Sequence, residues 1–286
     1  MKTIAITGAT GNVAGETIQA LQGKGVKLRA IVRNKEKAKR LEAAGVAVRV
    51  GDLERPRSLA GLFDGADTAF LTVSAGPRAP EQASNALWAA RQGGVKHVVR
   101  LSAFGAAHDA PTVNSRLHAL SDAELIHGGL TYTILKPHFY MQNLFGSAAS
   151  IKGEGAFYWA MGSGKVGLID TRDISEVAAH VLTTSGHDNK TYTLTGPSSI
   201  EMNAVAAALA RVLGKPVRYV AIPLEAQDQA LSGVGLDEWT VTMLGDYMSA
   251  YSRNWGDITT DEVPRLLGRP ARSIDDFARD LAAVFR

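Results

Sequence analysis

The chain of 286 residues contains no cysteine. Disulfide bonds, thiol nucleophiles and thiolate metal ligands are therefore excluded. The seven histidines include no pair three or four residues apart, so the helical His-x-x-x-His pattern of many metal sites is missing too. We expect no metal ion in this protein.

Long apolar runs are also missing. No stretch reaches the ~18 consecutive apolar residues of a membrane-spanning helix, and the N-terminus lacks the basic, apolar and small-residue order of a secretion signal. The sequence thus predicts a cytoplasmic protein with no membrane partner. Basic residues alternate with acids, and the formal net charge of +3 comes without a basic stripe or recognition motif, so nucleic acid is not an expected partner.

What the chain does have is a glycine-rich turn directly after its first apolar run. Residues 2–7 read as a buried strand, and apolar residues recur at helical spacing after residue 12. Glycines permit a tight turn and close approach to a pyrophosphate, whose charge faces the free N–H groups of the helix. The segment predicts a dinucleotide-binding unit. Its expected cofactor contacts are Gly8, Thr10, Gly11, Asn12 and Val13.

The end of the second predicted strand bears on which dinucleotide is bound. An NAD site usually has an acid about 20 residues past the glycines, whereas an NADP site uses arginine for the 2′-phosphate. Arg33 lies 22 residues after Gly11 with no acid beside it, and Lys37 falls in the first turn of the next predicted helix. A solvated basic face would explain these residues as well. Because a guanidinium suits a phosphate, the sequence favours NADP(H) over NAD(H).

Strands and helices continue to alternate as far as residue 137. Further strands are expected at 46–50, 67–73, 95–101 and 130–135, with helical patterns at about 35–44, 56–63, 80–93 and 112–127. This alternation predicts an α/β fold whose core is a doubly wound parallel sheet with right-handed crossovers.

Ligands of such a sheet bind beyond the carboxyl ends of its strands. The residues that close the predicted strands are thus further candidates for cofactor contacts. They are Asp52, Leu53, Thr72, Val73, Ser74, Lys136 and Pro137.

The composition changes after Pro137. Residues 138–168 are rich in glycine, serine and aromatic side chains, which suits the wall of an apolar pocket and equally suits ordinary core packing. A strand at 190–194, a helix at about 201–213 and the apolar segment 217–222 complete a smaller lobe. We expect residues 1–137 to form the dinucleotide-binding core and residues 138–286 to form mainly a substrate-binding α/β lobe, with room for segments that return to the core. Expected substrate contacts are Phe104, His138, Phe139 and Tyr140.

Six segments together resemble a known family. They are residues 7–13, 30–34, 51–53, 94–98, 130–137 and 189–194. In this order they are similar to the NmrA-like group of atypical short-chain dehydrogenases/reductases, especially its branch of triphenylmethane reductase and type 2 NAD(P)H:quinone oxidoreductases. The resemblance implies an extended Rossmann fold, NADP(H), and a small lobe that receives flat, conjugated acceptors.

Catalytic residues are less clear in the sequence. The wider superfamily carries Tyr-x-x-x-Lys on the helix after the fifth strand, where the tyrosine donates a proton to a carbonyl. Asn114 and His118 stand at those two positions, which disfavours simple alcohol or carbonyl chemistry. The resembling branch often has His-x-x-x-Glu here, read in this chain as His118 and Asp122, and it places a polar residue near the nicotinamide, here Ser102. Ser102 and His118 are the catalytic candidates, and His118 would relay a proton near neutral pH.

A conjugated acceptor would not need the missing acid. Its own π system spreads the charge that hydride transfer creates, so positioning of the reactants supplies much of the catalysis. We therefore expect an NADPH-dependent oxidoreductase, monomeric or homodimeric, that reduces a small aromatic or quinone-like substrate. Two alternatives stay open: a non-catalytic NADP(H)-binding redox sensor, and an auxiliary enzyme of an aromatic pathway such as an oxygenase or cyclase.

Overall fold

The computed structural model describes all residues from Met1 to Arg286 and contains one large and one small sheet. The large sheet has seven strands in the order β3-β2-β1-β4-β5-β6-β8. Its strands are β1 (Thr3–Thr7), β2 (Lys27–Val32), β3 (Ala47–Val50), β4 (Thr68–Leu71), β5 (His97–Leu101), β6 (Thr131–Pro137) and β8 (Lys190–Leu194).

The pairings of the large sheet confirm the predicted doubly wound fold. Every pairing from β3 across to β6 is parallel, and the strand order reverses between β1 and β4. β8 runs the same way as β6, because the amide of Asn189 donates to the carbonyl of Tyr132 and the amide of His138 donates to the carbonyl of Leu194. The carboxyl ends of all these strands therefore lie along one edge.

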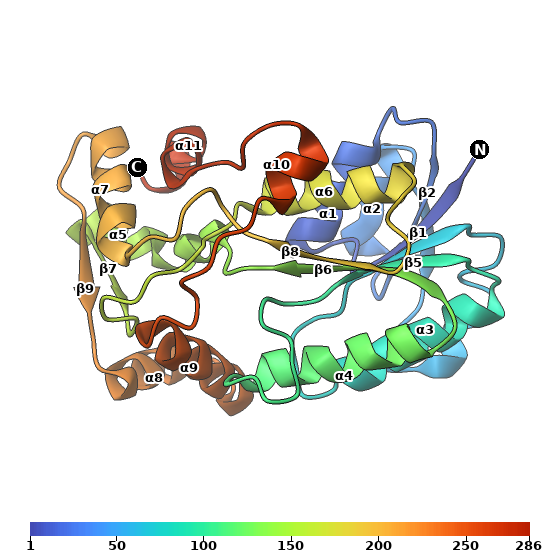
Figure 1. The fold of residues 1–286 in the computed structure, drawn as a ribbon, viewed down its shortest axis with the longest axis horizontal. Coiled ribbons are helices and arrows are strands. Elements are labelled where there is room, and N and C mark those ends of the chain that lie inside the picture. The colour runs from blue at the N-terminus through green and yellow to red at the C-terminus, as the bar shows by residue number, and fades with distance from the viewer. The chain divides into compact units, whose positions relative to one another are not determined.

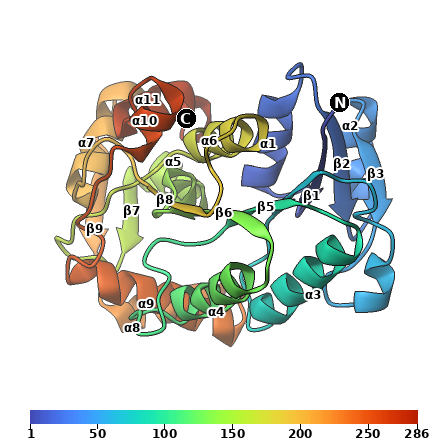
Figure 2. The same ribbon diagram turned by 45° about the vertical axis from the view of Figure 1, so that its right-hand side comes forward.

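Helices cover both faces of the large sheet. In Figures 1 and 2, α1 and α6 lie on one face, and α3 and α4 lie on the other. The helical segments that connect these strands are α1 (Asn12–Leu21), η1 (Glu36–Ala38), α2 (Lys39–Ala43), η2 (Pro56–Leu59), α3 (Ala79–Gln92), α4 (Val113–His127) and α6 (Thr171–Thr183).

One predicted helix is wrong. Only the short 3₁₀ segment η2 forms where the pattern indicated a helix over 56–63. Gly61 and Gly65 adopt φ values of 72° and 70°, in the left-handed region that a right-handed helix does not contain. Turns therefore replace the remainder of the expected helix.

The remaining elements include a small parallel sheet of two strands, β7 (Ala156–Trp159) and β9 (Arg218–Ala221). The elements around them are mostly helical. They are η3 (Met141–Ser147), α5 (Ala148–Glu154), α7 (Met202–Leu213), α8 (Leu224–Gly233), α9 (Glu238–Ser252), α10 (Glu262–Leu267), α11 (Ile274–Asp280) and η4 (Ala282–Val284).

The residues divide into two compact units. The first unit contains residues 1–109, 114–136 and 174–192, and the second contains residues 110–113, 137–173 and 193–286. Most of α6 and the start of β8 thus belong to the first unit although they follow residue 138 in the chain. The predicted boundary at residue 137 coincides with one of the points where the chain passes between the units.

Each unit has its own apolar core. Between the sheet and the helices α3 and α4, the core of the first unit is aliphatic with one phenylalanine, Phe63. The core of the second unit is richer in aromatic and methionine side chains, such as Phe157, Met161, Tyr251 and Phe277. The aromatic density of residues 138–168 is therefore used largely for packing inside the second unit.

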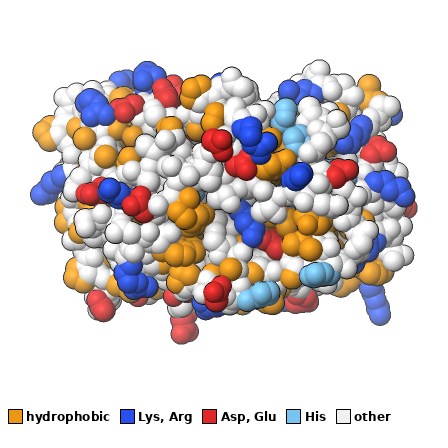
Figure 3. Space-filling model, in the orientation of Figure 1, with side chains coloured by type: hydrophobic (Ala, Val, Ile, Leu, Met, Phe, Trp, Pro, Cys, Tyr) orange, Lys and Arg blue, Asp and Glu red, His pale blue; other side chains and the backbone are white.

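No helix combines the length and the apolar character that crossing a membrane requires. On the face of the molecule drawn in Figure 3, basic and acidic side chains are intermingled.

Candidate functional site

The predicted glycine turn lies between β1 and α1. Gly8 adopts a φ of 60°, and a Cβ there would come within 2.2 Å of the Thr72 hydroxyl oxygen. The amide of Gly11 donates to the carbonyl of Gly8 at 2.8 Å, which closes the turn. Glycine is needed at position 8 because both the backbone angle and the neighbouring side chain leave no room for another residue.

Threonine side chains fix this turn to the neighbouring strand. The Thr7 hydroxyl donates to the carbonyl of Thr72 at 2.8 Å, and the Thr72 hydroxyl donates to the carbonyl of Thr7 at 2.8 Å. Both residues are buried. The reciprocal bonds hold the ends of β1 and β4 together at the point where the strand order reverses, which is where dinucleotides bind in this class of fold.

The start of α1 is suited to an anion. No side chain caps the N-terminus at Gly11, and the first turn contains no acid. Thr10, Gly11 and Asn12 are exposed, while Val13 is buried beneath the helix. The first N–H groups of α1 are thus available to a phosphate, and the residues present fit a dinucleotide.

Five basic side chains follow the end of β2, and they differ in their partners. Lys35 pairs with Glu42 at 3.7 Å, and Lys39 pairs with Glu36 at 2.5 Å. Arg33, Lys37 and Arg40 are exposed and form no ion pair. Of these three, Arg33 directly follows β2 and Lys37 comes next along the chain, whereas Arg40 belongs to α2.

The loop after β3 is held by its own hydrogen bonds. The amide of Asp52 donates to the Ser58 hydroxyl at 2.9 Å, and the Asp52 carboxylate accepts from the amide of Glu54 at 3.0 Å. The Asn85 side chain of α3 donates to the carbonyl of Leu53 at 2.8 Å. Asp52 and Leu53 are therefore fixed at the same edge as Thr72, which is followed by the half-buried Val73 and the exposed Ser74.

A buried polar cluster occupies the ends of β5 and β6. Asp122 of α4 accepts from the Arg100 guanidinium at 2.6 Å and from the Ser102 hydroxyl at 2.8 Å. The Lys136 ammonium lies 3.4 Å from the same carboxylate and donates to the carbonyl of Ala106 at 3.0 Å. Burial lowers the pKa of Arg100, an effect that the carboxylate of Asp122 opposes.

The local structure explains why these side chains meet. Arg100 and Ser102 are two residues apart on β5, so they point to the same face of the sheet. Leu101 pairs with Leu135 in register, which places Lys136 beside Ser102. His118 and Asp122 are four residues apart on α4 and face the sheet together.

His118 is held in a neutral form. Both terminal nitrogens of Arg100 lie 3.4 Å from its Nδ1 atom, and since a guanidinium only donates, that nitrogen is the acceptor. Burial, Arg100 and Lys136 lower the pKa of His118 to about 3. The proton relay near neutral pH that the sequence suggested for His118 does not fit this environment.

The expected substrate contacts are divided between the units. Phe104 is buried in the first unit, where its carbonyl accepts from the Ser115 hydroxyl at 3.1 Å. His138 and Phe139 belong to the second unit, as do Pro137 and Tyr140. There the ring of Tyr251 lies 5.6 Å from that of His138 and 5.5 Å from that of Phe139.

Burial affects the titratable members of this aromatic group. It lowers the pKa of His138 to about 3 and raises the pKa of Tyr140. Both rings are thus neutral over the ordinary pH range. They offer an apolar surface rather than acid or base chemistry.

Sequence reasoning missed Arg100 as a member of the site and named Asp122 only as part of a pattern. A signal was present, because Arg100 interrupts the apolar run of β5 with Val98 and Val99 before it. A charge in a strand that is covered on both faces requires a buried partner. Asp122 is that partner.

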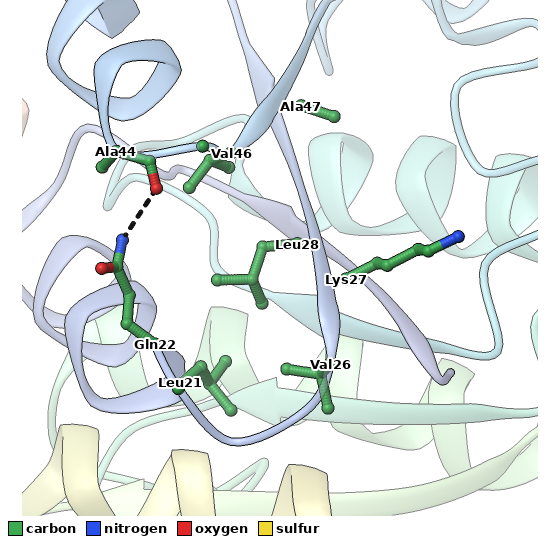
Figure 4. A pocket seen from close by; sticks show the side chains of 10 residues that line it. Leu21, Gln22, Val26, Lys27, Leu28, Ala44, Val46 and Ala47 are labelled. Carbon is green, nitrogen blue, oxygen red and sulfur yellow. Dashed lines mark hydrogen bonds between the residues drawn. The ribbon is translucent and has the colours of Figure 1, made fainter.

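A separate hollow of about 450 Å³ lies at the opposite edge of the large sheet. Figure 4 shows Leu21, Gln22, Val26 and Leu28 lining it, with the Gln22 side chain donating to the carbonyl of Ala44. These residues surround the amino ends of β2 and β3. The hollow carries no acid or nucleophile and is distinct from the strand ends where the candidate residues lie.

Relatives of known structure and function support the same fold. A curated relative, the NAD(P)H azoreductase of Xenophilus azovorans, is 37% identical over 282 residues, which cover 99% of each chain. The NADPH-dependent quinone oxidoreductase of Escherichia coli, solved with NADPH, superposes with a TM-score of 0.88 at 29% identity and covers 98% of this chain and 99% of its own. The triphenylmethane reductase of Citrobacter sp., solved with NADP(H), gives a TM-score of 0.88 at 29% identity, with 97% and 99% covered.

The sheet order and the glycine turn define the class as a Rossmann-type α/β protein. Residues 1–244 match the sequence profile of the NmrA-like family. The chain belongs to the NmrA-like family, which confirms the resemblance found in the sequence.

Proposed function

We propose that this protein is an NADPH-dependent oxidoreductase that delivers hydride to a quinone or to another conjugated aromatic acceptor. The relatives named above are azo, quinone and triphenylmethane reductases, and the latter two were solved with NADPH or NADP(H). Their acceptors share an extended π system. The chain is an NAD(P)H-dependent reductase, and the class of its acceptor is what we propose.

The observation that carries the proposal is the pairing of an uncapped glycine turn with the unpaired cations Arg33 and Lys37. The turn at Gly8 and Gly11 offers N–H groups to the pyrophosphate. Arg33 and Lys37, at the end of the neighbouring strand, offer charge to a 2′-phosphate. Together they support NADP(H) over NAD(H).

The remaining cofactor contacts follow from the order of the strands. Asp52 and Leu53 close β3 on the side of Arg33, and Thr72 to Ser74 follow β4 on the other side of the glycine turn. Lys136 and Pro137 close β6. We assign the adenosine half of the cofactor to the first group and the nicotinamide half to the second, because a dinucleotide spans the point of strand reversal.

The chemistry that NADPH supplies is transfer of a hydride to the acceptor. The chain's own residues bind and orient the reactants. Asn114 and His118 replace the tyrosine and lysine that would protonate an alkoxide, and His118 is neutral, so the acceptor must spread the charge that it gains. Ser102, whose hydroxyl donates to Asp122, remains a candidate for contact with the reactants through its lone pairs.

Binding and turnover test the proposal separately. The purified protein should bind NADPH more tightly than NADH, and Arg33→Ala should lose about 1.5–3 kcal/mol of NADPH binding while NADH binding is unchanged, since the guanidinium contacts only the 2′-phosphate. Titration of the nucleotide fluorescence measures both affinities. Arg40→Ala, which changes an exposed arginine within α2, is the control for a general loss of positive charge. Equal affinities of the parent protein for the two nucleotides would contradict the assignment.

Acceptors are then tested with NADPH at saturation. We expect oxidation of NADPH, followed by its absorbance, when menadione, an azo dye such as methyl red or a triarylmethane dye is added. If NADPH binds and no acceptor in the panel is reduced, the protein is a redox sensor rather than an enzyme.

A further inference from the structure

The cluster around Asp122 contains two cationic side chains from adjacent strands. Arg100 and Lys136 both pair with the carboxylate of Asp122, and the carboxylate of Glu124 acts on Arg100 as well. His118 completes the cluster as a neutral ring, as the Arg100 contacts to its Nδ1 atom require. The carboxylates thus act most strongly on Arg100, and Lys136 is the less closely compensated cation at the ends of β5 and β6.

The charge of Lys136 is compensated less closely than that of Arg100. Asp122 and Arg100 form a direct pair at 2.6 Å, and their side chains are 5% and 2% exposed. Lys136 lies farther from the carboxylate, at 3.4 Å, and its side chain is 21% exposed. Of the cations in the cluster, Lys136 is the one that a ligand at the strand ends can reach.

The ammonium of Lys136 is held in position, but not all of its N–H groups have an acceptor. It carries three N–H groups. One is directed at the carbonyl of Ala106 and a second at the Asp122 carboxylate. The third has no partner within the first unit and is free to meet an acceptor atom of a ligand.

The order of the strands indicates which part of the reaction this ammonium would face. Arg33 and Asp52 lie on the β2 and β3 side of the glycine turn, and Lys136 and Ser102 lie on the β5 and β6 side. If the phosphate-bearing half of the cofactor occupies the first side, the reacting half occupies the second. Lys136 thus stands on the side where hydride leaves and the acceptor is reduced.

We propose that Lys136 is a catalytic residue that stabilises the negative charge formed on the acceptor and then protonates it, with Asp122 and Arg100 as positioning residues. This inference rests on the proposed function. The superfamily places a lysine on the helix after the fifth strand, where this chain has His118. Lys136 of β6 would take over the role of that lysine. Asp122 fixes the ammonium, and Arg100 holds the Asp122 carboxylate in place through the 2.6 Å pair.

With a quinone as the acceptor, hydride addition supplies two electrons and one hydrogen nucleus while NADPH is oxidised. The acceptor becomes a hydroquinone monoanion. A proton passes from Nζ of Lys136 to the phenolate oxygen, breaking an N–H bond and forming an O–H bond. The neutral amine regains its proton from water, which its partial exposure allows.

The test uses the full-length protein with p-nitrophenol, an unreactive mimic of the reduced acceptor whose anion absorbs visible light and whose neutral form does not. In the presence of NADP⁺, the parent protein should bind the phenolate about tenfold more tightly than the phenol, because one nearby charge supplies an interaction of this size. Lys136→Met should lose this preference. Lys136→Arg, which keeps the charge, should retain it.

Turnover with menadione gives a second readout of the same variants. Lys136→Met should lower kcat about 100-fold, as removal of one charge-stabilising donor does in other enzymes, with a far smaller change in the Kd of NADPH because the other cofactor contacts remain. Lys96→Met, at the exposed amino end of β5, is the matched control and should change neither phenolate binding nor kcat.

The outcomes separate the inference from the proposed function. If the parent protein oxidises NADPH and Lys136→Met keeps both its rate and its phenolate preference, the inference is overturned and the proposed function stands. Loss of NADPH affinity with the phenolate preference intact would make Lys136 a cofactor contact only, which overturns it as well. If the parent protein reduces no acceptor, the proposed function fails regardless of the variants.

Discussion

Two buried carboxylates, Asp122 in the first unit and Asp173 in the second, each face two cationic side chains. Asp173 is fully buried at the start of α6 and accepts hydrogen bonds from the guanidinium groups of Arg269 and Arg272. It also accepts from the backbone amide of Arg272 at 2.6 Å. In composition the two clusters are nearly the same.

They differ in where their cations come from. Arg269 and Arg272 lie on the segment between α10 and α11, and their side chains are 32% and 25% exposed. Asp173 therefore fastens a piece of chain, with both guanidinium groups in contact with water. Asp122 instead binds cations from two adjacent strands, close to the edge where ligands bind. A buried acid with two cations thus stabilises a chain segment in the second unit and belongs to a candidate site in the first. The position of the acid in the fold makes the difference.

The largest expected effect comes from removing each of the two buried carboxylates. Asp122→Ala should lower the free energy of unfolding by about 3–5 kcal/mol, because it leaves the buried Arg100 without its counterion. Asp173→Ala should cost about 2 kcal/mol, because the partly exposed arginines that it releases can be hydrated. Urea denaturation of both variants measures the difference. Equal losses would mean that exposure of the cations does not matter and that the two clusters are equivalent.

A smaller loss of stability is expected when alanine replaces a glycine with a left-handed backbone conformation, and each unit offers one such glycine for comparison. Gly8→Ala in the first unit should destabilise the protein by about 2 kcal/mol through its positive φ and the clash with Thr72. Gly214→Ala, at the end of α7 in the second unit, has a φ of 65° with open space around the position and should cost about 1 kcal/mol.

Nucleotide binding distinguishes these two variants further. Only Gly8→Ala should also lose NADPH affinity, since only Gly8 belongs to the turn that approaches the pyrophosphate. Gly76→Ala, where a Cβ would meet nothing within 4 Å, should leave both properties intact. NADPH binding that survives Gly8→Ala would remove the glycine turn from the cofactor site.

A pH-dependent effect is expected from one neutral histidine in each unit. His118 and His138 both have a pKa lowered to about 3 in the folded protein, below the 6.5 of a free histidine. Between these values the unfolded chain binds more protons than the folded one, so stability is complete above pH 6.5 and is lost as the pH falls toward 3. Each histidine contributes a slope of at most about 1.4 kcal/mol per pH unit, and His118→Gln or His138→Gln should remove its share in a series of urea denaturations at different pH values.

The causes of the two low pKa values differ, so one variant should change the pKa of His118 without changing that of His138. Arg100 and Lys136 act on His118, whereas burial alone lowers the pKa of His138. Lys136→Met should therefore raise the pKa of His118 and leave that of His138 unchanged in an NMR titration of the ring protons. A joint shift of both would show that the variant loosens the whole protein.

Regular elements of the first unit could be predicted from the sequence to within a few residues. The strands at 46–50 and 130–135 correspond to β3 and β6, and the helix at 112–127 corresponds to α4. Their apolar periodicity is strong because both faces of the sheet are covered. In the second unit, strand β7 was not predicted, since its run of aromatic residues at 156–159 is compatible with a core, a pocket wall or a strand.

The site residues likewise include some that could be predicted from the sequence and some that could not. Those at strand ends, such as Gly8, Arg33 and Ser102, could be named because parallel strands place their carboxyl ends along one edge. The assignment of Arg33 and Lys37 to the cofactor and of Ser102 to the reactants stays a prediction. Arg100 could not be named, because its role depends on a carboxylate 22 residues away on α4, and sequence spacing does not show which helix covers which strand.

The sequence by itself determined the family, the doubly wound sheet and the glycine turn, because each of these follows from local spacing that survives without any long-range contact. Only the tertiary structure decided which charges meet. It brought Asp122 of α4 between Arg100 of β5 and Lys136 of β6, left Lys136 the more exposed of the two cations, and lowered the pKa of His118 through burial and those cations. The strength of a charge depends on its neighbours and on the water that they exclude, and both are properties of the folded chain.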